Sequence, residues 1–408
     1  MNWNIKSIDE ITEIVTKGTT PSTYGMPFTD EGINFIKAEA LNGDVTLDRG
    51  GFTFINEETH EKLKRSKLQH EDVLVTIAGA NVGKCGFVRP SDVPANTNQA
   101  VGIVRVKKQE ANPRYIYYHF KNPSTFAMCQ GIGGGQAAQP NINLTMLKGF
   151  KVNMPDIGSQ NRIVDVIGAY DDLIENSRRR IELLEESARQ LYKEWFVCFR
   201  FPGHEHIKMI DGVPDGWDKG VIADFFDTTS GGTPSRKNPD FYTGDINWVK
   251  TQELNEGFIF STEEKITDEA LSKSSAKLFP EDTLLVSMYG GTNIGRTGIL
   301  ASPAASNQAC CALLPKDERS HYIYASLFFY FKRKELIAVS QGAAQTNINQ
   351  QTVRGLKINF APASLMDVFI DTLLPVYDQI RNLQKEIAYL TQARDLLLPK
   401  LMNGEVAV

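Results

Sequence analysis

An internal repeat limits what this chain can fold into, because the same series of short motifs is read twice in the same order. The paired motifs are GTTPS (18–22) and GGTPS (231–235), INFIK (33–37) and INWVK (246–250), NQA (98–100) and NQA (307–309), YIY (115–117) and YIY (322–324), and AAQPNIN (137–143) and AAQTNIN (343–349). A kept order with a slowly drifting offset is typical of a duplicated domain with small insertions and deletions. The sequence therefore predicts two copies of one domain.

Each copy combines short strand-like runs with one aromatic helix. Runs such as VLVTIAG and TLLVSMY are bounded by Gly, Pro and Asn, which favours short β-strands joined by turns. The aromatic stretches PRYIYYHFKN and HYIYASLFFYFKRK favour a helix in each copy. Asn143 and Asn349 each precede a helix-like stretch and are expected to be N-caps. We predict an α+β domain of about 150 residues.

A long helix is expected after each copy. From Ile163 to Trp195 the apolar residues return at alternating intervals of four and three, which is the heptad seam of a coiled coil. A second seam runs from Phe369 to Leu401, with Arg394 in one slot and Pro375 expected to begin or kink the helix. The predicted segments are a first globular domain (1–154), a first long helix (155–200), a linker (201–213), a second globular domain (214–362) and a second long helix (363–408).

Composition excludes several classes of protein. The chain has 408 residues, is 41% hydrophobic and 23% charged, and carries a formal net charge of −5. This composition is ordinary for a soluble protein, and the negative net charge does not indicate nucleic-acid binding. If the chain binds DNA, its basic residues must therefore be concentrated on one face. No apolar run approaches a membrane span, and five cysteines without a C-x-x-C pair suit a reducing cytoplasm. We expect a cytoplasmic protein.

Two glycine-rich stretches resemble phosphate-binding loops without matching them. GGTNIGRT (290–297) has an arginine in place of the lysine, and GANVGKC (79–85) is one residue short and ends on a cysteine. Gly and Pro follow both stretches where a P-loop requires a helix, so we predict glycine-rich turns. HEH (204–206) has no third metal ligand nearby, and no nucleophile–base pair is evident. We therefore expect no catalytic site, no metal and no cofactor on this chain.

The sequence resembles the DNA-specificity subunit of a type I restriction-modification system. The resemblance is carried by PDIGSQNRIV (155–164), LYKEWFVCFRFPG (191–203) and TQARDLLLPKLMNGEV (391–406), together with the repeated GGTPS and AAQ-NIN motifs. It implies two target-recognition domains, each of which reads one half of a split site in double-stranded DNA. It also implies that the two long helices pack antiparallel as a spacer, with an approximate two-fold axis relating the domains. Two copies of a modification (methyltransferase) subunit would dock on these helices, and restriction/translocase subunits would join the full complex. S-adenosylmethionine and ATP are expected on those partners.

Candidate DNA contacts lie in the loops that both copies share. The candidates are Thr20, Ser22, Thr23, Lys37, Asn81, Lys84, Gln136 and Gln139 in the first copy, and Thr233, Ser235, Arg236, Lys250, Tyr289, Thr292, Asn293, Arg296, Gln341 and Gln345 in the second. Hydroxyl, amide and cationic groups suit phosphates and base edges. Lys37 and Lys250 match each other, so we expect scaffold or phosphate roles. Thr23 matches Arg236, and the two glycine loops differ in length, so these positions are better candidates for reading bases.

The helices also offer a candidate protein interface. The seam residues Ile174, Ile181, Leu184, Ile380, Leu383, Ile387 and Leu390 are expected to pair the two helices. Residues Leu191, Trp195, Phe196, Leu396, Leu397 and Leu401 are expected to leave a surplus of apolar surface that receives the modification subunits. Two other functions stay open: a diverged nucleotide- or S-adenosylmethionine-using enzyme, and a degenerate scaffold that no longer binds DNA. The sequence does not give the target bases, the spacer length or the methylated base.

Overall fold

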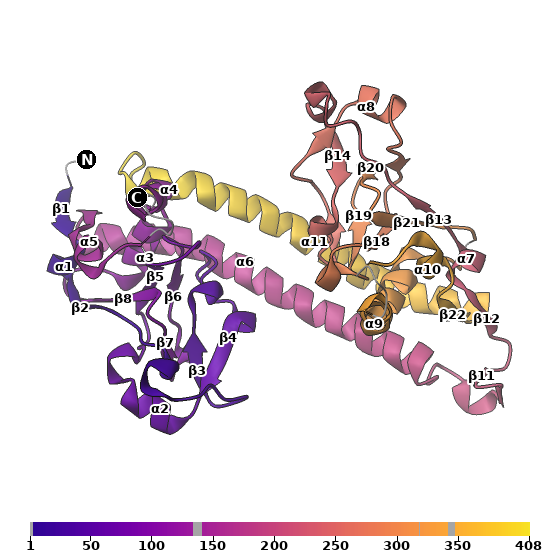
Figure 1. The fold of residues 1–408 in the computed structure, drawn as a ribbon, viewed down its shortest axis with the longest axis horizontal. Coiled ribbons are helices and arrows are strands. Elements are labelled where there is room, and N and C mark those ends of the chain that lie inside the picture. The colour runs from indigo at the N-terminus through magenta and orange to yellow at the C-terminus, as the bar shows by residue number, and fades with distance from the viewer. Residues whose placement is uncertain (1–2, 134–140, 318, 342–346) are drawn as a thin grey trace. The chain divides into compact units, whose positions relative to one another are not determined.

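The computed structural model describes residues 3–133, 141–317, 319–341 and 347–408. The chain divides into two compact units, the first made of Met1–Asn176 with Ile387–Val408 and the second of Ser177–Glu386. Each unit holds one copy of the repeat together with a portion of each long helix (Figure 1). In the described part of the chain no helix is both long and apolar enough to cross a membrane.

The first unit is an α+β structure with three small sheets. The four-stranded sheet has the order β2-β8-β5-β6, the three-stranded sheet β4-β3-β7, and the two-stranded sheet β1-β9. Its elements are β1 (Asn4–Ser7), α1 (Ile8–Ile11), β2 (Thr12–Lys17), β3 (Ile33–Ile36), β4 (Phe52–Ile55), α2 (Glu57–Lys62), β5 (Val73–Thr76), β6 (Cys85–Phe87), β7 (Ala95–Thr97), β8 (Val101–Val106), α3 (Pro113–Lys121), α4 (Pro123–Gly133), α5 (Leu144–Gly149) and β9 (Lys151–Met154).

The second unit repeats this plan. Its elements are β10 (Met209–Ile210), β11 (Val213–Pro214), β12 (Asp218–Val221), α7 (Ile222–Phe225), β13 (Phe226–Ser230), β14 (Ile246–Val249), β15 (Phe258–Ile259), β16 (Lys265–Ile266), α8 (Asp268–Ser272), β17 (Leu278–Phe279), β18 (Leu284–Ser287), β19 (Thr297–Leu300), β20 (Ala304–Ser306), β21 (Cys310–Pro315), α9 (Tyr322–Gln341), α10 (Gln350–Arg354) and β22 (Lys357–Phe360).

Sheet topology confirms the duplication. The order β13-β21-β18-β19 in the second unit matches β2-β8-β5-β6 in the first, and β12-β22 matches β1-β9. The parallel pair β14–β20 likewise matches β3–β7. The predicted caps are also present, because the Asn143 and Asn349 side chains accept backbone hydrogen bonds from Met146 and Thr352, at 2.9 and 2.8 Å. Two copies of one α+β domain are therefore confirmed.

Both long helices are present, and many residues of their heptad seams are buried. Helix α6 runs Ile157–Tyr192 and continues into a π-helical turn (Lys193–Val197), and α11 runs Ala363–Met402. Seam residues such as Ile167, Ile174, Phe369 and Ile380 are almost inaccessible to solvent. Because α11 begins at Ala363, the prediction that Pro375 begins this helix is wrong. Pro375 lies within the helix, and the alternative that it kinks the helix stays a prediction.

Within each unit the two helix portions run antiparallel. In the first unit Arg162 contacts Val408, whereas Asp171, further along α6, contacts Arg394, which lies earlier in the chain. In the second unit the Trp195 ring lies 5.5 Å from that of Phe369. Each unit closes its core over these helix portions with the aromatic residues of α3 or α9.

Candidate nucleic-acid interface

In each unit several loops meet at one end of the central sheet. In the first unit Ile77, just past β5, donates a backbone hydrogen bond to Ala100 and accepts one from Ile142, each 2.8 Å long. In the second unit Met288 makes the same pair of bonds with Ala309 and Ile348. We name the surrounding residues the first loop cluster (18–23, 79–84 and 98–100, with Lys37) and the second loop cluster (231–236, 290–296 and 307–309, with Lys250).

The GTTPS and GGTPS loops are held against a neighbouring strand by a glycine. Thr19 donates a backbone hydrogen bond of 3.0 Å to Thr97 at the end of β7, and Gly232 donates one of 2.8 Å to Ser306 at the end of β20. A Cβ on Gly18 would lie 2.0 Å from the Thr97 carbonyl oxygen, and one on Gly231 would lie 2.1 Å from that of Ser306. Only glycine permits this close approach in either copy.

A threonine–glutamine pair closes each loop cluster. The Thr20 hydroxyl donates to the Gln99 side-chain oxygen, and the Thr233 hydroxyl donates in the same way to Gln308. The sequence prediction named both threonines and missed both glutamines. The signal was present in the NQA triplet that occurs in each copy. The bond orients each glutamine amide, and a fixed amide is the group that reads adenine in the major groove.

The two glycine-rich stretches are turns between antiparallel strands. β5 pairs with β6 across the first stretch, and β18 pairs with β19 across the second. Gly79, Gly83, Gly290 and Gly295 take positive φ angles in these turns. Among the described residues each turn leads into a strand and not into a helix, so the predicted glycine-rich turns are confirmed.

Each turn presents one cation that is not used in the fold. Lys84 and Arg296 are partly exposed, and within the described residues their side chains make no hydrogen bond or ion pair. Asn81 and Asn293 lie beside them and are partly exposed, while Tyr289 and Thr292 are exposed. Such a turn offers a positive charge with amide and hydroxyl groups around it, which suits a phosphate oxygen or a base edge.

Arg236 in the second loop cluster is held in a fixed position. Its guanidinium donates to Glu264 at 2.6 Å and lies over the rings of Tyr242 and Trp248, at 4.1 and 5.2 Å from their centroids. The hydrogen bond from Arg236 lowers the pKa of Glu264 below its ordinary value. About half of the Arg236 side chain stays exposed (55%), so its outer edge is available to a ligand.

Lys37 and Lys250 occupy matching places but have different neighbours. Lys250 donates to Glu263 and Glu264, at 2.7 and 3.0 Å, and the hydrogen bond to Glu263 raises its pKa. Lys37 lies 4.5 Å from the centroid of the Phe28 ring. The side chain of Lys250 is only 13% exposed. Lys250 is therefore part of the local ion-pair structure, and the scaffold or phosphate role expected for Lys37 and Lys250 stays a prediction.

Of the remaining candidate DNA contacts, some are exposed in loops and others lie outside the described residues. Ser22 and Thr23 lie in a short 3-10 turn (Pro21–Tyr24) and are exposed, and Ser235 is also exposed in its loop. Gln136, Gln139 and Gln345 lie outside the described residues, as does the side chain of Gln341.

The expected surplus of apolar surface at the helix ends is partly wrong. Trp195, Phe196 and Leu401 are each less than 10% exposed because they fill the cores of the units. Phe196 packs on Tyr324 and Phe369, with ring centroids 4.8 and 4.7 Å apart. Leu191 and Leu397 are half-buried, and Leu396 is 63% exposed. The error arose because a helix considered without its domain leaves apolar residues that the domain in fact covers.

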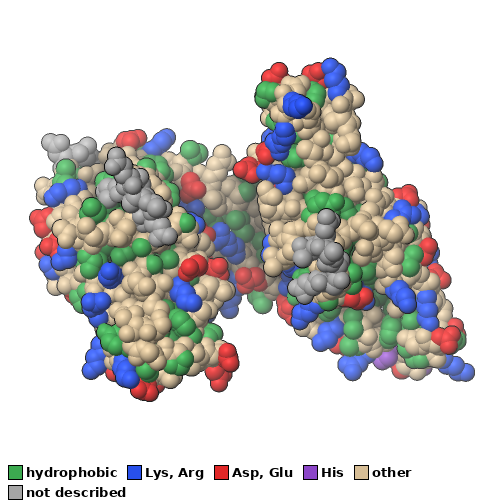
Figure 2. Space-filling view, viewed as in Figure 1, with side chains coloured by type: hydrophobic (Ala, Val, Ile, Leu, Met, Phe, Trp, Pro, Cys, Tyr) green, Lys and Arg blue, Asp and Glu red, His purple; other side chains and the backbone are tan. Residues whose placement is uncertain are grey.

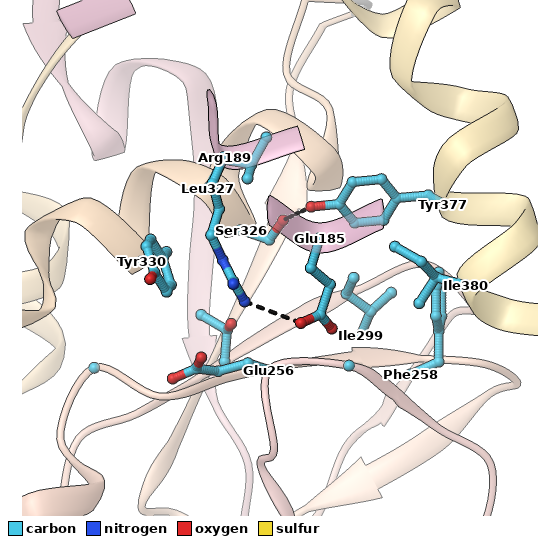
Figure 3. A pocket seen from close by; sticks show the side chains of 13 residues that line it. Glu185, Arg189, Glu256, Phe258, Ile299, Ser326, Leu327, Tyr330, Tyr377 and Ile380 are labelled. Atoms are coloured by element: carbon cyan, nitrogen blue, oxygen red, sulfur yellow. Dashed lines mark hydrogen bonds and ion pairs between the residues drawn. The ribbon is translucent and has the colours of Figure 1, made fainter. Parts of the chain in front are cut away.

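The enclosed polar groups of the second unit hold the fold together. A cavity of about 30 Å³, with room for about two water molecules, lies among α6, α9, α11 and the strands β15 and β19. Figure 3 shows the side chains that line it. Arg189 donates to Glu185 at 3.0 Å across it, and the Ser326 and Tyr377 hydroxyls lie 3.0 Å apart. Burial raises the pKa of Glu185 above its ordinary value. Glu185 and Arg189 pair within α6, whereas Ser326 of α9 pairs with Tyr377 of α11, so these polar groups are satisfied inside the unit.

Two histidine-containing groups carry side chains of the kind that bind metal ions. HEH forms an exposed 3-10 turn in which His204 contacts the Phe201 carbonyl at 2.8 Å. Glu57, His60 and Glu61 lie together on α2, but His60 is bonded to Asn96 and Glu61 is paired with Lys67. Both groups therefore have local partners.

Charge on the surface is mixed. Figure 2 shows, on the face in view, Lys and Arg side chains interspersed with Asp and Glu on both units rather than gathered in one large patch. The free cations of the loop clusters are thus local features. Taken together, the structure defines a class of protein with two homologous α+β domains, each presenting a polar loop cluster, joined by long helices.

Comparison with known proteins identifies the family. The family described as type I restriction modification DNA specificity domain matches residues 1–186 and 214–392, once per copy of the repeat. The chain belongs to this family and is a type I restriction-modification specificity subunit with two target-recognition domains.

Relatives and a solved structure agree. The MjaIX specificity subunit of Methanocaldococcus jannaschii is 26% identical over 100% of this chain and 94% of its own length. The HindI specificity subunit of Haemophilus influenzae is 25% identical over 65% of this chain and 71% of its own. The S subunit of a type I restriction-modification system from M. genitalium, at 15% identity, has the same fold, with a TM-score of 0.62 over 98% of this chain and 96% of that one.

Proposed function

We propose that each loop cluster binds one half of a bipartite site in double-stranded DNA and that the chain directs its partners to that site. The proposal is supported by a comparison of the two loop clusters: the contacts that hold the loops in place are the same in both, whereas the side chains exposed to solvent differ. Both clusters keep the glycine contact and the threonine–glutamine pair, whereas Lys84 is replaced by Arg296 and Thr23 by Arg236. Two readers of unrelated half-sites need this combination, because scaffold groups position the backbone and variable groups specify bases.

The proposed assembly contains two modification subunits, with restriction and translocase subunits in the full complex. The duplicated plan supports two copies of one partner, since equivalent surfaces bind equivalent molecules. In this proposal the partner subunits carry out the catalytic reactions. S-adenosylmethionine and ATP bind to these subunits and not to this chain. The comparisons support a non-catalytic part, since the relatives that this chain matches are named specificity subunits. The antiparallel helices are proposed to hold the two readers a fixed number of base pairs apart.

DNA selection by the assembled complex tests the proposal. Co-purified complex is incubated with a random duplex pool, and bound DNA is recovered and sequenced, in parallel with methylation mapping of a host that carries or lacks the gene. The expected result is one bipartite motif with a constant spacer in both experiments. A complex that recovers no motif, or a purified chain that binds S-adenosylmethionine or ATP by itself, contradicts the proposal.

A further inference from the structure

Each unit has a surface pocket at the same place in the repeat. In the first unit a pocket of about 220 Å³ is bounded by α3, α4, β9 and the end of α11, and we name it the Lys151 pocket. In the second unit a pocket of about 550 Å³ is bounded by α9, β22 and the end of α6, and we name it the Lys357 pocket. None of the residues lining either pocket comes from a loop cluster.

The two pockets are built on the same framework. In the first, the Tyr115 hydroxyl donates to the Asn153 carbonyl at 2.7 Å, and in the second the Tyr324 hydroxyl donates to the Asn359 carbonyl. These bonds match Tyr115 with Tyr324, two residues beyond Tyr322, its counterpart in the alignment of the YIY motifs. The strands beneath them read KVNM and KINF and pair with β1 and β12. In both units the rim is completed by the end of the long helix that follows the other copy, which is α11 in the first unit and α6 in the second.

The repeat has kept a lysine and an asparagine at the outward-facing positions of these two strands. Val152, Met154, Ile358 and Phe360 point inward and are buried, so the core explains them. Lys151 and Lys357 are exposed, and within the described residues neither ammonium group makes a hydrogen bond or an ion pair. The side chains of Asn153 and Asn359 are likewise without hydrogen bonds there, although their carbonyl groups accept the tyrosines. A shared ligand explains why both copies retain these groups.

The linings indicate the chemistry of that ligand. The Lys357 pocket has aromatic walls from Phe328 and Phe331, and Val197 at its rim is 51% exposed. Glu335 on the same rim is already paired with Lys332 at 2.7 Å, so Lys357 keeps an uncompensated charge. The Lys151 pocket places His119 and Met128 near its lysine. A ligand with an apolar side chain next to a carboxylate fits both linings. The apolar wall of the pocket would contact the side chain, and the lysine ammonium and the asparagine amide would bind the carboxylate.

We propose that the Lys151 and Lys357 pockets bind the same acidic segment, one apolar side chain beside a carboxylate, from two copies of one partner protein. This inference rests on the proposed function, in which the partner present in two copies is the modification subunit. The larger, more aromatic Lys357 pocket holds its copy more tightly than the Lys151 pocket, because aromatic walls bury more of an apolar anchor.

Zero-length crosslinking tests whether both pockets hold the same segment. A carbodiimide joins a lysine ammonium to a carboxylate in direct contact, forming an amide with the loss of water to the reagent. Applied to the co-purified complex, the reagent should link Lys151 and Lys357 to the same acidic residue of the partner, as read by peptide mass spectrometry. Links from the two lysines to different partner segments, or no link from either, overturn the inference.

Charge reversal tests whether the pockets hold the partner. Lys151→Glu and Lys357→Glu should each remove one copy in native mass spectrometry, and the double variant should remove both. Lys64→Glu and Lys334→Glu reverse exposed lysines outside the pockets and should keep two copies. A double variant that keeps two copies with wild-type affinity overturns the pocket assignment and leaves the proposed function standing. A wild-type chain that binds no modification subunit overturns both.

Discussion

At the scale of single residues, Arg236 is the side chain most directly suited to reading a base. It is stacked on Tyr242 and Trp248 and oriented by Glu264, and its outer edge is exposed. A bidentate contact with guanine discriminates by about 1–3 kcal/mol. We expect Arg236→Ala to relax one position of one half-site by this amount and to leave the other half-site unchanged. Affinities of the assembled complex for single-base variants of its site measure this.

The control for that experiment is Arg236→Lys, which keeps the charge and loses the fork of donors. It should retain overall affinity and still lose base preference. If Arg236→Ala instead weakens binding equally on all sequences and reduces the salt dependence, the arginine contacts a phosphate and reads no base.

Phe196 shows how burial reverses an expectation from sequence. Because its ring is enclosed by Trp217, Tyr324 and Phe369, Phe196→Asp would remove a core aromatic side chain and bury a carboxylate. We expect a loss of at least about 3 kcal/mol in the free energy of unfolding, measured by urea denaturation. Leu396→Asp, on an exposed side chain of α11, should stay within about 0.5 kcal/mol of the wild type. Equal stability of the two variants would contradict the burial of Phe196.

His119 gives the first unit a predicted sensitivity to acid. His119 lies on α3, and its burial lowers its pKa from 6.5 to about 4 because the charged form loses its hydration. Between these values the unfolded chain binds more protons than the folded chain, so stability falls as the pH is lowered from about 6.5 to about 4. The full loss is on the order of 3 kcal/mol. Lys151 is the charged side chain that lines the same pocket.

The matched variant is His119→Phe, since Phe328 lines the corresponding pocket of the second unit. Urea midpoints measured between pH 7 and pH 4 should fall less steeply for His119→Phe than for the wild type. Parallel curves for the two proteins would show that His119 takes up its proton without cost.

At the scale of elements, a buried ionic network joins α6 and α11 in the first unit. Asp171 accepts from Arg394 and from the Tyr118 hydroxyl, each at 2.8 Å, and Lys121 lies 3.8 Å away. Removing one charge from a buried pair leaves the other uncompensated. We expect Asp171→Asn to cost about 3 kcal/mol in urea denaturation, with faster hydrogen exchange in α3. Adding Arg394→Met should recover most of that loss, and a double variant as unstable as the single one would contradict this account.

The sequence predicts elements well where the pattern is local. The alternating intervals of four and three predicted α6 and α11. Asn143 and Asn349 predicted the starts of two further helices, and the glycine-rich stretches predicted turns. It failed where a distant segment decides. Pro375 sits inside α11, where Leu373 and Tyr377 on either side of it pack in the core of the second unit. Trp195 is buried against Phe369 of α11. Gln99 was missed because its partner Thr20 lies 79 residues away in sequence.

At the scale of the whole molecule, the proposed spacer function makes a quantitative prediction. Adding four residues to each long helix, after Ser177 in α6 and after Glu386 in α11, lengthens each by about 6 Å, and adding seven lengthens each by about 10 Å. At about 3.4 Å per base pair these insertions correspond to about two and three extra pairs. Seven residues also preserve the heptad seam, whereas four rotate it by part of a turn. Methylation mapping should show both half-sites kept and the spacer lengthened in these steps.

A Gly-Ser insertion of equal length after His206, in an exposed turn, should leave the spacer unchanged. A folded, active complex whose spacer ignores the helix insertions would show that the helices do not set the distance between half-sites.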